Sequence, residues 1–298
     1  MIEMEYITLD KKELIKDYLS QRCTQNSEFT FTNLFMWRKS YDIRYAIINN
    51  SLCLMPKHSS GPRSATFPIG GTAYIKETVE ELIDYFVKRD EEPLIRLYDD
   101  KSVQQLNELF PNKFIITEDI NAYDYVYNVK DLINLSGKKY HGKKNHINKF
   151  KSLYNYEYST MTPSDKEECL NLFDKWYESK KYEIAGVSEE REAVAEFLDN
   201  WKELDIVGGC IRVDGKMVAF SFGEPLCGCK NTVVIHLEHA DTNYQGIYPM
   251  INQQFLEHEW SEFEYVNREE DMGLEGLRKA KQSYRPVFMV KKYVATLA

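Results

Sequence analysis

Five polar residues stand side by side near the C-terminal end of the chain, where positions 267–271 read Asn-Arg-Glu-Glu-Asp. They follow a stretch in which Phe263, Tyr265 and Val266 are interleaved with acidic residues, a pattern that predicts a strand. Guanidinium and amide groups can bind an anion, and carboxylates can accept a proton. The sequence therefore predicts a ligand-binding or catalytic role for this polar cluster at a strand end.

A helix with a cationic flank is expected directly after the cluster. The apolar stripe of that helix is Leu274, Leu277, Ala280 and Tyr284. Arg278, Lys281 and Arg285 lie three or four positions apart, so they share one flank beside the stripe. Because guanidinium groups meet phosphates and carboxylates two-pronged, we expect Arg268, Arg278 and Lys281 to bind an anion, with Asn267 as a polar partner.

Two interpretations of the arginines stay open. If Arg268 and Arg278 converge on one ligand, replacing either by alanine abolishes binding and leaves the thermal stability within a few degrees. If Arg268 instead pairs with Glu269, Glu270 or Asp271 inside the fold, its removal strands a buried carboxylate and costs several kcal/mol. For the helix as a whole, the structural interpretation is a solvated face with ordinary surface ion pairs.

Transfer of an acyl group to an amine needs one group that takes a proton and another that stabilises the leaving side. We select Glu269 as the base and Tyr284 as the acid toward a leaving thiolate or ribose oxygen. Glu238, His239 and Asp271 are further candidates at strand ends. Taken singly, each of these residues is more often structural than catalytic, and the chain has no Ser-His-Asp nucleophile pattern and no P-loop.

Basic residues are concentrated in a second stretch. No acidic residue occurs from Leu132 to Tyr156, although the whole chain has a formal net charge of −9. The lysines at its start are Lys138, Lys139, Lys143 and Lys144. Such a stretch is either a solvated face or a surface for phosphate oxygens, those of a small acyl donor or those of tRNA bound along Lys138–Lys151. Tyr140 and His141 would add stacking surfaces for an unpaired base.

The chain repeats one order of elements: helices, a hairpin, a strand, a glycine-containing loop, a helix, a strand, a helix and a strand. Asn49-Asn50 and Asp214-Gly215 mark the hairpin turns. We divide the chain into residues 1–125, a basic crossover at 126–154, and residues 155–298, which carry the site. The crossover is expected to be helical from about Lys143, with its lysines outward. The fold class is α/β (α+β), with a mixed sheet flanked by helices in each half.

Three strings of this sequence resemble a bacterial family related to the C-terminal catalytic domain of phosphatidylglycerol lysyltransferases. They are NREEDMGLEGLRKAKQSYRP from Asn267, LSGKKYHGKKNHINKF from Leu135 and FTNLFMWR from Phe31. The resemblance covers nearly the whole chain. It implies two tandem acyltransferase folds of the GNAT type, as in the Fem-type aminoacyltransferases, with the first half degenerate. The lysyltransferases join this domain to a membrane-embedded portion that this sequence lacks, so the acceptor stays open between a small and a lipid-like molecule.

The resemblance also implies where an acyl donor would bind. In GNAT folds the central strand separates from its neighbour, and the loop and helix after it hold the pyrophosphate of the acyl donor with backbone N–H groups. The matching loop is 241–248, where Gln245 and Gly246 stand in place of the acyl-CoA signature. The second glycine of that signature is missing and Tyr248 is bulky. Acyl-CoA and aminoacyl-tRNA therefore both remain candidate co-substrates, and no tightly bound cofactor is expected.

The six cysteines show no framework of spacings, and most lie in apolar runs, so reduced thiols and a cytoplasmic location are expected. A zinc site built from Cys227, Cys229, His236 and His239 is disfavoured, because residues three apart on a strand point to opposite faces. No apolar run is long enough to span a membrane. We expect an acyl- or aminoacyltransferase that acts on an amine or hydroxyl, the alternative being a non-catalytic anion-, nucleotide- or RNA-binding module.

Overall fold

The computed structural model describes residues 2–57, 61–180 and 187–298. The elements of the first part of the chain are β1 (Glu5–Tyr6), α1 (Lys12–Ser20), α2 (Phe31–Trp37), β2 (Arg44–Ile48), β3 (Ser51–Met55), β4 (Ala65–Thr66), β5 (Ile69–Gly70), α3 (Ile75–Val87), β6 (Leu94–Leu97), α4 (Asp100–Leu109), β7 (Phe114–Glu118), β8 (Asp124–Asn128), α5 (Val129–Asn134) and α6 (His141–Leu153). The elements of the second part are β9 (Tyr156–Thr160), α7 (Lys166–Lys180), α8 (Val187–Asp199), α9 (Trp201–Leu204), β10 (Val207–Val213), β11 (Lys216–Pro225), β12 (Thr232–Ala240), α10 (Ile247–Glu259), β13 (Tyr265–Asn267), α11 (Glu275–Gln282), β14 (Phe288–Val290) and β15 (Tyr293–Leu297).

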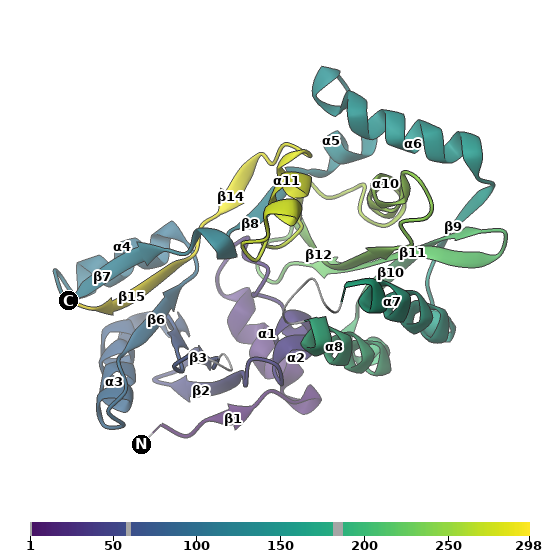
Figure 1. Cartoon of the computed structure of the whole chain (residues 1–298). Coiled ribbons are helices and arrows are strands. Elements are labelled where there is room, and N and C mark those ends of the chain that lie inside the picture. The colour runs from purple at the N-terminus through teal and green to yellow at the C-terminus, as the bar shows by residue number, and fades with distance from the viewer. Residues whose placement is uncertain (1, 58–60, 181–186) are drawn as a thin grey trace.

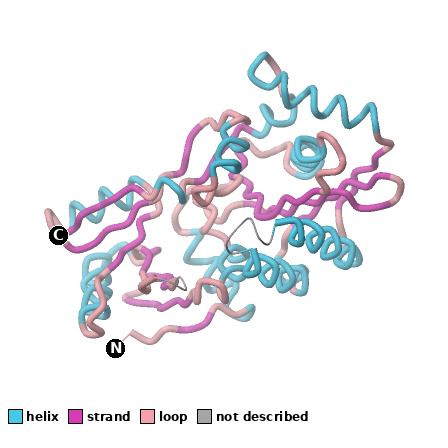
Figure 2. The backbone as a smooth tube through the Cα atoms, in the orientation of Figure 1, coloured by secondary structure: helices cyan, strands magenta, loops and turns pink. Residues whose placement is uncertain are grey.

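The strands of the described residues form one large and two small sheets. The large sheet has seven strands in the order β14-β8-β13-β12-β11-β10-β9, and the small sheets have the orders β1-β2-β3-β5 and β4-β6-β15-β7. The large sheet is mixed, because β12 runs parallel to β13 while β11 and β8 are antiparallel to their neighbours. The predicted fold class, an α+β chain with mixed sheets flanked by helices, is confirmed (Figure 2).

Both hairpins form where their turn residues predict them. Asn49 and Asn50, with φ angles of 48° and 61°, join β2 to β3. Asp214 and Gly215, with φ angles of 51° and 77°, join β10 to β11. Two consecutive residues with positive φ give a turn whose twist matches that of paired strands, and Asn, Asp and Gly tolerate this conformation best. Local residue chemistry is sufficient for these two elements.

Helices cover both faces of the large sheet (Figure 1). α5, α6 and α10 lie on one face, and α7 and α8 lie on the other. On the first face, Ile251 and Phe255 of α10 are buried against the sheet. Ile147 and Phe150 of α6 are buried in the same core cluster, where α6 contacts α10. The basic helix α6 therefore lies across α10, one layer further from the sheet.

Two strands pair across the expected domain boundaries. β8 joins β13 and β14 in the large sheet. β15, the last strand, lies between β6 and β7 of the first half (Figure 1). The boundary that placed all of residues 155–298 in the second domain is therefore corrected at its end, because residues 293–297 complete a sheet of the first half. The division into two tandem halves otherwise stays a prediction.

The expectation of reduced cysteines is wrong for two of the six. Cys23 and Cys229 form a disulfide, with their Cα atoms 4.9 Å apart, that joins the end of α1 to the loop between β11 and β12. The two residues are 206 positions apart, so sequence spacing contains no sign of the bond. The free thiols are Cys53, Cys169, Cys210 and Cys227. Within the described ranges, no cluster of side chains could hold a metal ion and no helix is long and apolar enough to cross a membrane.

The position of β15 can be tested by burying a charge in it. Ala295 is fully buried at the middle of the strand, so Ala295→Asp is expected to lower the free energy of unfolding by at least about 3 kcal/mol, measured by urea denaturation. Thr296→Asp, on the half-exposed face of the same strand, is the control and should cost less than about 1 kcal/mol. Equal effects of the two substitutions would contradict the placement of β15 between β6 and β7.

Candidate site at the opening between two strands

The large sheet opens between β12 and β13. The two strands pair in parallel only as far as Val234 opposite Asn267, although β12 continues to Ala240. At the parting point β12 has a bulge against β11, in which His236 is the extra residue. Bulges re-aim side chains and are over-represented next to active sites. The separation of the central strand that the sequence resemblance implied is thus observed, and it locates the candidate site.

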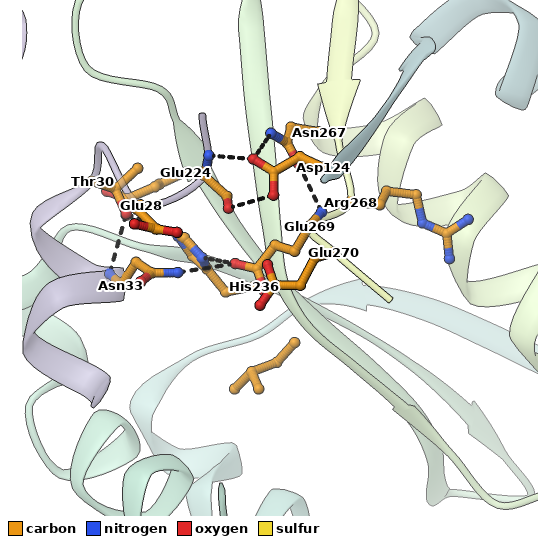
Figure 3. A network of polar contacts seen from close by, with 12 residues as sticks. Glu28, Thr30, Asn33, Asp124, Glu224, His236, Asn267, Arg268, Glu269 and Glu270 are labelled. Carbon is orange, nitrogen blue, oxygen red and sulfur yellow. Dashed lines mark hydrogen bonds and ion pairs between the residues drawn. The ribbon is translucent and has the colours of Figure 1, made fainter. Parts of the chain in front are cut away.

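Two side-chain ion pairs bridge the opening where the backbone ladder is lost. Near the parting point, Nδ1 of His236 lies 2.9 Å from Oε1 of Glu269. Further along β12, Nη2 of Arg268 donates to Oε1 of Glu238 at 2.9 Å. Arg268 and Glu269 are neighbours in the sequence, but their side chains point away from one another (Figure 3). The two pairs therefore belong to different surroundings.

The ion pair of Arg268 with Glu238 is part of a group that we call the cation cluster. Its members are Arg268, Glu238, Lys143, Tyr284, Tyr127 and Asn252. The guanidinium carbon of Arg268 lies 4.7 Å from the centre of the Tyr284 ring and 5.8 Å from that of Tyr127. Nζ of Lys143, from α6, lies 3.9 Å from the centre of the same Tyr284 ring. Two cations from distant parts of the chain thus share one aromatic ring, an arrangement that the ring quadrupole stabilises.

The charges in the cation cluster do not balance. Glu238 pairs with Arg268 and accepts a second hydrogen bond from Nδ2 of Asn252 at 3.2 Å, whereas Lys143 faces the Tyr284 ring. Among the described residues, Nη1 of Arg268 is buried without a hydrogen-bond partner. Burial, and then the charge of Arg268, lower the pKa of Lys143 to about 8. A buried unpaired N–H beside a second cation suits the binding of an anionic group.

The structure does not bring Arg278 into the cation cluster. Its guanidinium holds both oxygens of Asp271, with Nε to Oδ2 at 2.7 Å and Nη2 to Oδ1 at 2.9 Å, and it also donates to Asn121. The hydroxyl of Tyr125 donates to Asp271 as well. Burial would raise the pKa of Asp271, but the hydrogen bonds from Arg278 and Tyr125 outweigh it and lower that pKa. Arg278 therefore does not converge with Arg268 on one ligand but forms an ion pair within the protein. Arg268 is also paired internally, with Glu238 and not with Glu269, Glu270 or Asp271 as expected.

Lys281 stabilises the backbone of residues 267–271, which we call the polar motif, and does not face the cation cluster. The chain turns at Glu269, whose φ is 57°, and the carbonyl groups of three successive residues converge there. Nζ of Lys281 donates to the carbonyl oxygens of Arg268 at 2.5 Å, Glu269 at 3.0 Å and Glu270 at 2.6 Å. An ammonium has three N–H donors, so these bonds occupy all of them. Burial lowers the pKa of Lys281 to about 8.

The ion pair of His236 with Glu269 is part of a second group, which we call the buried network. It joins the first half of the chain to the polar motif (Figure 3). Its members are Glu28, Thr30, Asn33, Asp124, Glu224, His236, Asn267, Glu269, Glu270 and Lys292. Nδ2 of Asn267 donates to the backbone oxygen of Gln25 at 2.6 Å and to Asp124 at 2.9 Å. Glu269 accepts a hydrogen bond from Asn33 at 3.3 Å. Asn267 and Glu269 thus lie outside the cation cluster, and Glu269 is engaged in the network and not positioned as a base for the cluster.

His236 is held between two carboxylates. Nε2 lies 3.0 Å from Glu224, and Nδ1 contacts Glu269. Both ring nitrogens donate in this arrangement, so the imidazole is protonated. Burial alone would lower the pKa of His236, but the hydrogen bonds to Glu224 and Glu269 outweigh it and raise the pKa to about 9. His236 is therefore a structural cation at neutral pH.

Lys292 anchors the other end of the buried network. Its Nζ lies 3.0 Å from Asp124, 3.0 Å from Glu28 and 3.8 Å from Glu270. Burial raises the pKa of Glu270 to about 7, against the opposing charge of Lys292. Sequence reasoning missed Lys292, Asp124 and Glu224. For Asp124 in β8 and Glu224 in β11 the available signal was a charged residue in an apolar strand, since a buried charge needs a partner. Lys292, between β14 and β15, gave no such signal.

The loop 241–248, which was predicted to bind phosphate, is covered by α6, and most of its amides donate to groups of the protein. Gly246 caps α10 with a φ of 88°, and a Cβ there would meet the carbonyl oxygen of His146 in α6 at 2.3 Å. The amide of Gln245 donates to the Tyr154 hydroxyl at 3.4 Å. The amides of residues 243, 244, 247 and 250 donate to groups of the protein itself. Pro249, the third residue of α10, has no N–H. The loop therefore has few amides left for an anion.

The predicted lysine patch divides into two parts. The exposed members are Lys138, Lys139 and Lys144. The expectation that all these lysines face outward is wrong for Lys143, which stands four residues before Ile147 and is turned inward on the same face of α6. Tyr140 is buried and cannot stack on a base, whereas His141 is exposed.

A recess of about 900 Å³ lies away from the opening, between α7 and the turn from β10 to β11. It is lined by Glu168, Asn171, Leu172, Asp174, Lys175, Glu178, Gly215, Lys216 and Met217. None of the residues predicted to form the site lines this recess. We place the candidate site at the strand opening because the bulge, the ion pairs and the unpaired guanidinium nitrogen all meet there.

Comparisons with known sequences agree with the resemblance. The sequence profile of the family described as "Phosphatidylglycerol lysyltransferase, C-terminal" matches residues 21–296. An uncharacterised protein of Mycoplasmoides gallisepticum is 26% identical over 181 residues, which cover 58% of this chain and 56% of that protein. The match thus spans little more than half the length of that relative.

Solved structures show the same fold. The crystal structure of a conserved protein of unknown function from Bacteroides thetaiotaomicron is 36% identical over 100% of both chains, with a TM-score of 0.93. The C-terminal domain of a putative lysylphosphatidylglycerol synthetase from Agrobacterium fabrum is 12% identical, with a TM-score of 0.67 over 96% of this chain and 91% of that one. FemX is 8% identical, with a TM-score of 0.63 over 99% and 97%. At these identities the last two comparisons show a shared fold alone.

The protonated His236 predicts a pH dependence of stability. Its folded pKa of about 9 exceeds the ordinary value of about 6.5, so its stabilising effect is full below that value and is lost as the pH rises through 9. Urea denaturation should show that His236→Gln lowers the free energy of unfolding by about 3 kcal/mol more at pH 6 than at pH 9.5. A mutant effect that is constant over this range would mean that His236 is neutral in the folded protein.

The pairing of Arg268 with Glu238 predicts non-additive substitutions. Arg268→Ala leaves the Glu238 carboxylate buried and unpaired, so the free energy of unfolding should fall by about 3–5 kcal/mol. The double variant Arg268→Ala/Glu238→Gln removes the stranded charge and should recover more than half of that loss. Thermal and urea denaturation measure both variants. Additive losses would refute the internal ion pair and return Arg268 to the ligand-only interpretation.

Proposed function

This chain belongs to the family of the C-terminal domain of phosphatidylglycerol lysyltransferases, and from that premise we propose that it transfers an aminoacyl group from aminoacyl-tRNA to an amine or hydroxyl acceptor. The family and the fold that it shares with FemX support an aminoacyltransferase-like role. The choice of aminoacyl-tRNA over acyl-CoA is carried by one observation, the position of α6 over the start of α10.

An acyl-CoA would need its pyrophosphate on the free amides at the start of α10. Here the backbone of Gly246 is in contact with the backbone of His146. The rings of Tyr154 and Tyr244, 5.1 Å apart, cover the same loop. A pyrophosphate would have to displace α6 and break the hydrogen bonds that the loop amides already make. A tRNA has no need of this groove, because its phosphates are spread along a backbone that a basic surface can bind.

The cation cluster supplies groups that suit the transfer itself. The ester bond between the aminoacyl group and the ribose oxygen breaks, the acceptor forms the new bond, and the acceptor's proton passes to the ribose oxygen. Burial raises the pKa of Tyr284, against the opposing effect of Arg268, so the phenol is protonated at neutral pH and can donate to the leaving oxygen. The unpaired Nη1 of Arg268 can donate to the carbonyl oxygen as negative charge develops on it.

Lys143 links this chemistry to the basic surface. The exposed lysines Lys138 and Lys144 lie within a few residues of it at the start of α6. A polyanion bound along the outer face of α6 therefore has its end close to the cluster. With a pKa of about 8, Lys143 can also exchange a proton near neutral pH, which suits a general acid or base.

The experiment measures the transfer of a radiolabelled amino acid from charged tRNA to an acceptor. Total bacterial tRNA carrying a radiolabelled amino-acid mixture is incubated with the protein and either phosphatidylglycerol vesicles or a soluble primary amine, and acetyl-CoA is assayed separately by release of free thiol. We expect label to leave the tRNA and no thiol release above the protein-free rate. Lys143→Met should lower the transfer rate by about ten- to a hundredfold, the worth of one charge-assisted hydrogen bond.

Lys144→Met is the control, because Lys144 is the next residue of α6 and faces solvent. At saturating tRNA it should change the transfer rate by no more than about twofold, whereas the loss of one phosphate contact should weaken tRNA binding and lower its salt dependence. Thiol release from acetyl-CoA at a rate comparable to deacylation of tRNA would overturn the choice of acyl donor. Salt-dependent binding of tRNA without any deacylation would instead establish the non-catalytic RNA-binding alternative.

A further inference from the structure

The turn formed by residues 227–229 is fastened to the end of α1. Its central residue, Gly228, has a φ of 73°, and a Cβ there would meet the carbonyl oxygen of Arg22 at 2.7 Å and that of Ser20 at 3.1 Å. The last residue of the turn, Cys229, is bonded to Cys23. Close backbone packing and one covalent bond therefore hold the loop between β11 and β12 against the first half of the chain.

The segments that leave this disulfide lead to the opening between β12 and β13. Two residues after Cys23, Gln25 donates from Nε2 to the hydroxyl of Thr232 at 3.0 Å. Its backbone oxygen accepts a hydrogen bond from Asn267 at 2.6 Å. Thr232 begins β12 and Asn267 ends β13, just before Arg268. One side chain and one carbonyl group of Gln25 thus connect both strands at their paired end.

We propose that the Cys23–Cys229 disulfide is a redox-controlled clamp on the opening between β12 and β13. A dithiol reductant delivers two electrons and two protons: the S–S bond breaks, both sulfurs become thiols, and the reductant becomes a disulfide. Gln25 then loses its covalent anchor, and its hydrogen bonds to Thr232 and Asn267 open more often. Arg268 consequently leaves the geometry of the cation cluster more often. The effect on binding of the acyl donor rests on the proposed function, but the motion itself does not.

Cys227 provides a control within the same turn. It is a free thiol two residues from Cys229, and burial raises its pKa to about 11. Thiol–disulfide exchange requires a thiolate, which is scarce at neutral pH for such a group. Cys227→Ser should therefore leave the clamp intact.

The test combines thiol titration with hydrogen exchange. Of the six cysteines, four are free, so protein unfolded without reductant should give four thiols, and six after treatment with dithiothreitol. Reduction should speed amide exchange in residues 24–28 and 229–234 by at least about tenfold and leave α3, remote from the disulfide, unchanged. Cys23→Ser/Cys229→Ser should exchange rapidly without reductant, and Cys227→Ser should match the wild type.

Six thiols before reduction, or equal exchange in the two redox states, would overturn the clamp. If the double variant does not fold, as circular dichroism would show, the reversible reduction of wild-type protein decides. Affinity for aminoacyl-tRNA is measured in both states, and a loss of about tenfold on reduction supports control of the site. Unchanged affinity in a protein whose clamp has opened would refute that control. Failure to bind tRNA in either state would count against the proposed function and leave the exchange result standing.

Discussion

The parting of β12 from β13 is the constraint on which the rest of the structure depends. Beyond Val234 and Asn267 the two strands no longer share a hydrogen-bond ladder, so side chains must hold the opening at a fixed width. Two buried ion pairs do this, and each is stable only because further polar groups compensate for its desolvation. Glu224 accepts a hydrogen bond from the second ring nitrogen of His236, and Asn252 donates to the second oxygen of Glu238. What remains without a partner among these groups is one nitrogen of Arg268.

This arrangement makes the first half of the chain more than a passive support. Asn33 contacts Glu269, Gln25 contacts Asn267, and Glu28 contacts Lys292. The polar motif at 267–271 is therefore connected to the first half on one side and to the cation cluster on the other. Because Arg268 and Glu269 are adjacent in the chain, a change in the buried network shifts the backbone that carries Arg268. Substitutions far from the opening can alter the site without touching a ligand.

Sequence alone predicted the local elements and singled out the polar motif beside the candidate site, but it did not assign the partners of the charged residues. Turn residues such as Asp214-Gly215 act through their own φ angles, so their hairpins were predictable. The choice between ligand binding and internal pairing for Arg278 depended on Asp271, which tertiary packing brings to it. The inward position of Lys143 was accessible, because Lys143, Ile147, Phe150 and Tyr154 are spaced four, three and four apart and form one helix face. The contacts of Lys292 depend on packing between the halves and have no local signature.

The position of β15 between β6 and β7 has a consequence for folding during synthesis on the ribosome. A ribosome synthesises β6 and β7 long before it reaches Tyr293–Leu297, yet that strand occupies the position between them. Until residues 293–297 leave the exit tunnel, β6 lacks a partner along one edge and β7 has no partner among the described strands, and unpaired edges invite association with other chains. The nascent first half therefore cannot reach its final form by itself. Folding of the first half must wait until residues 293–297 enter its sheet.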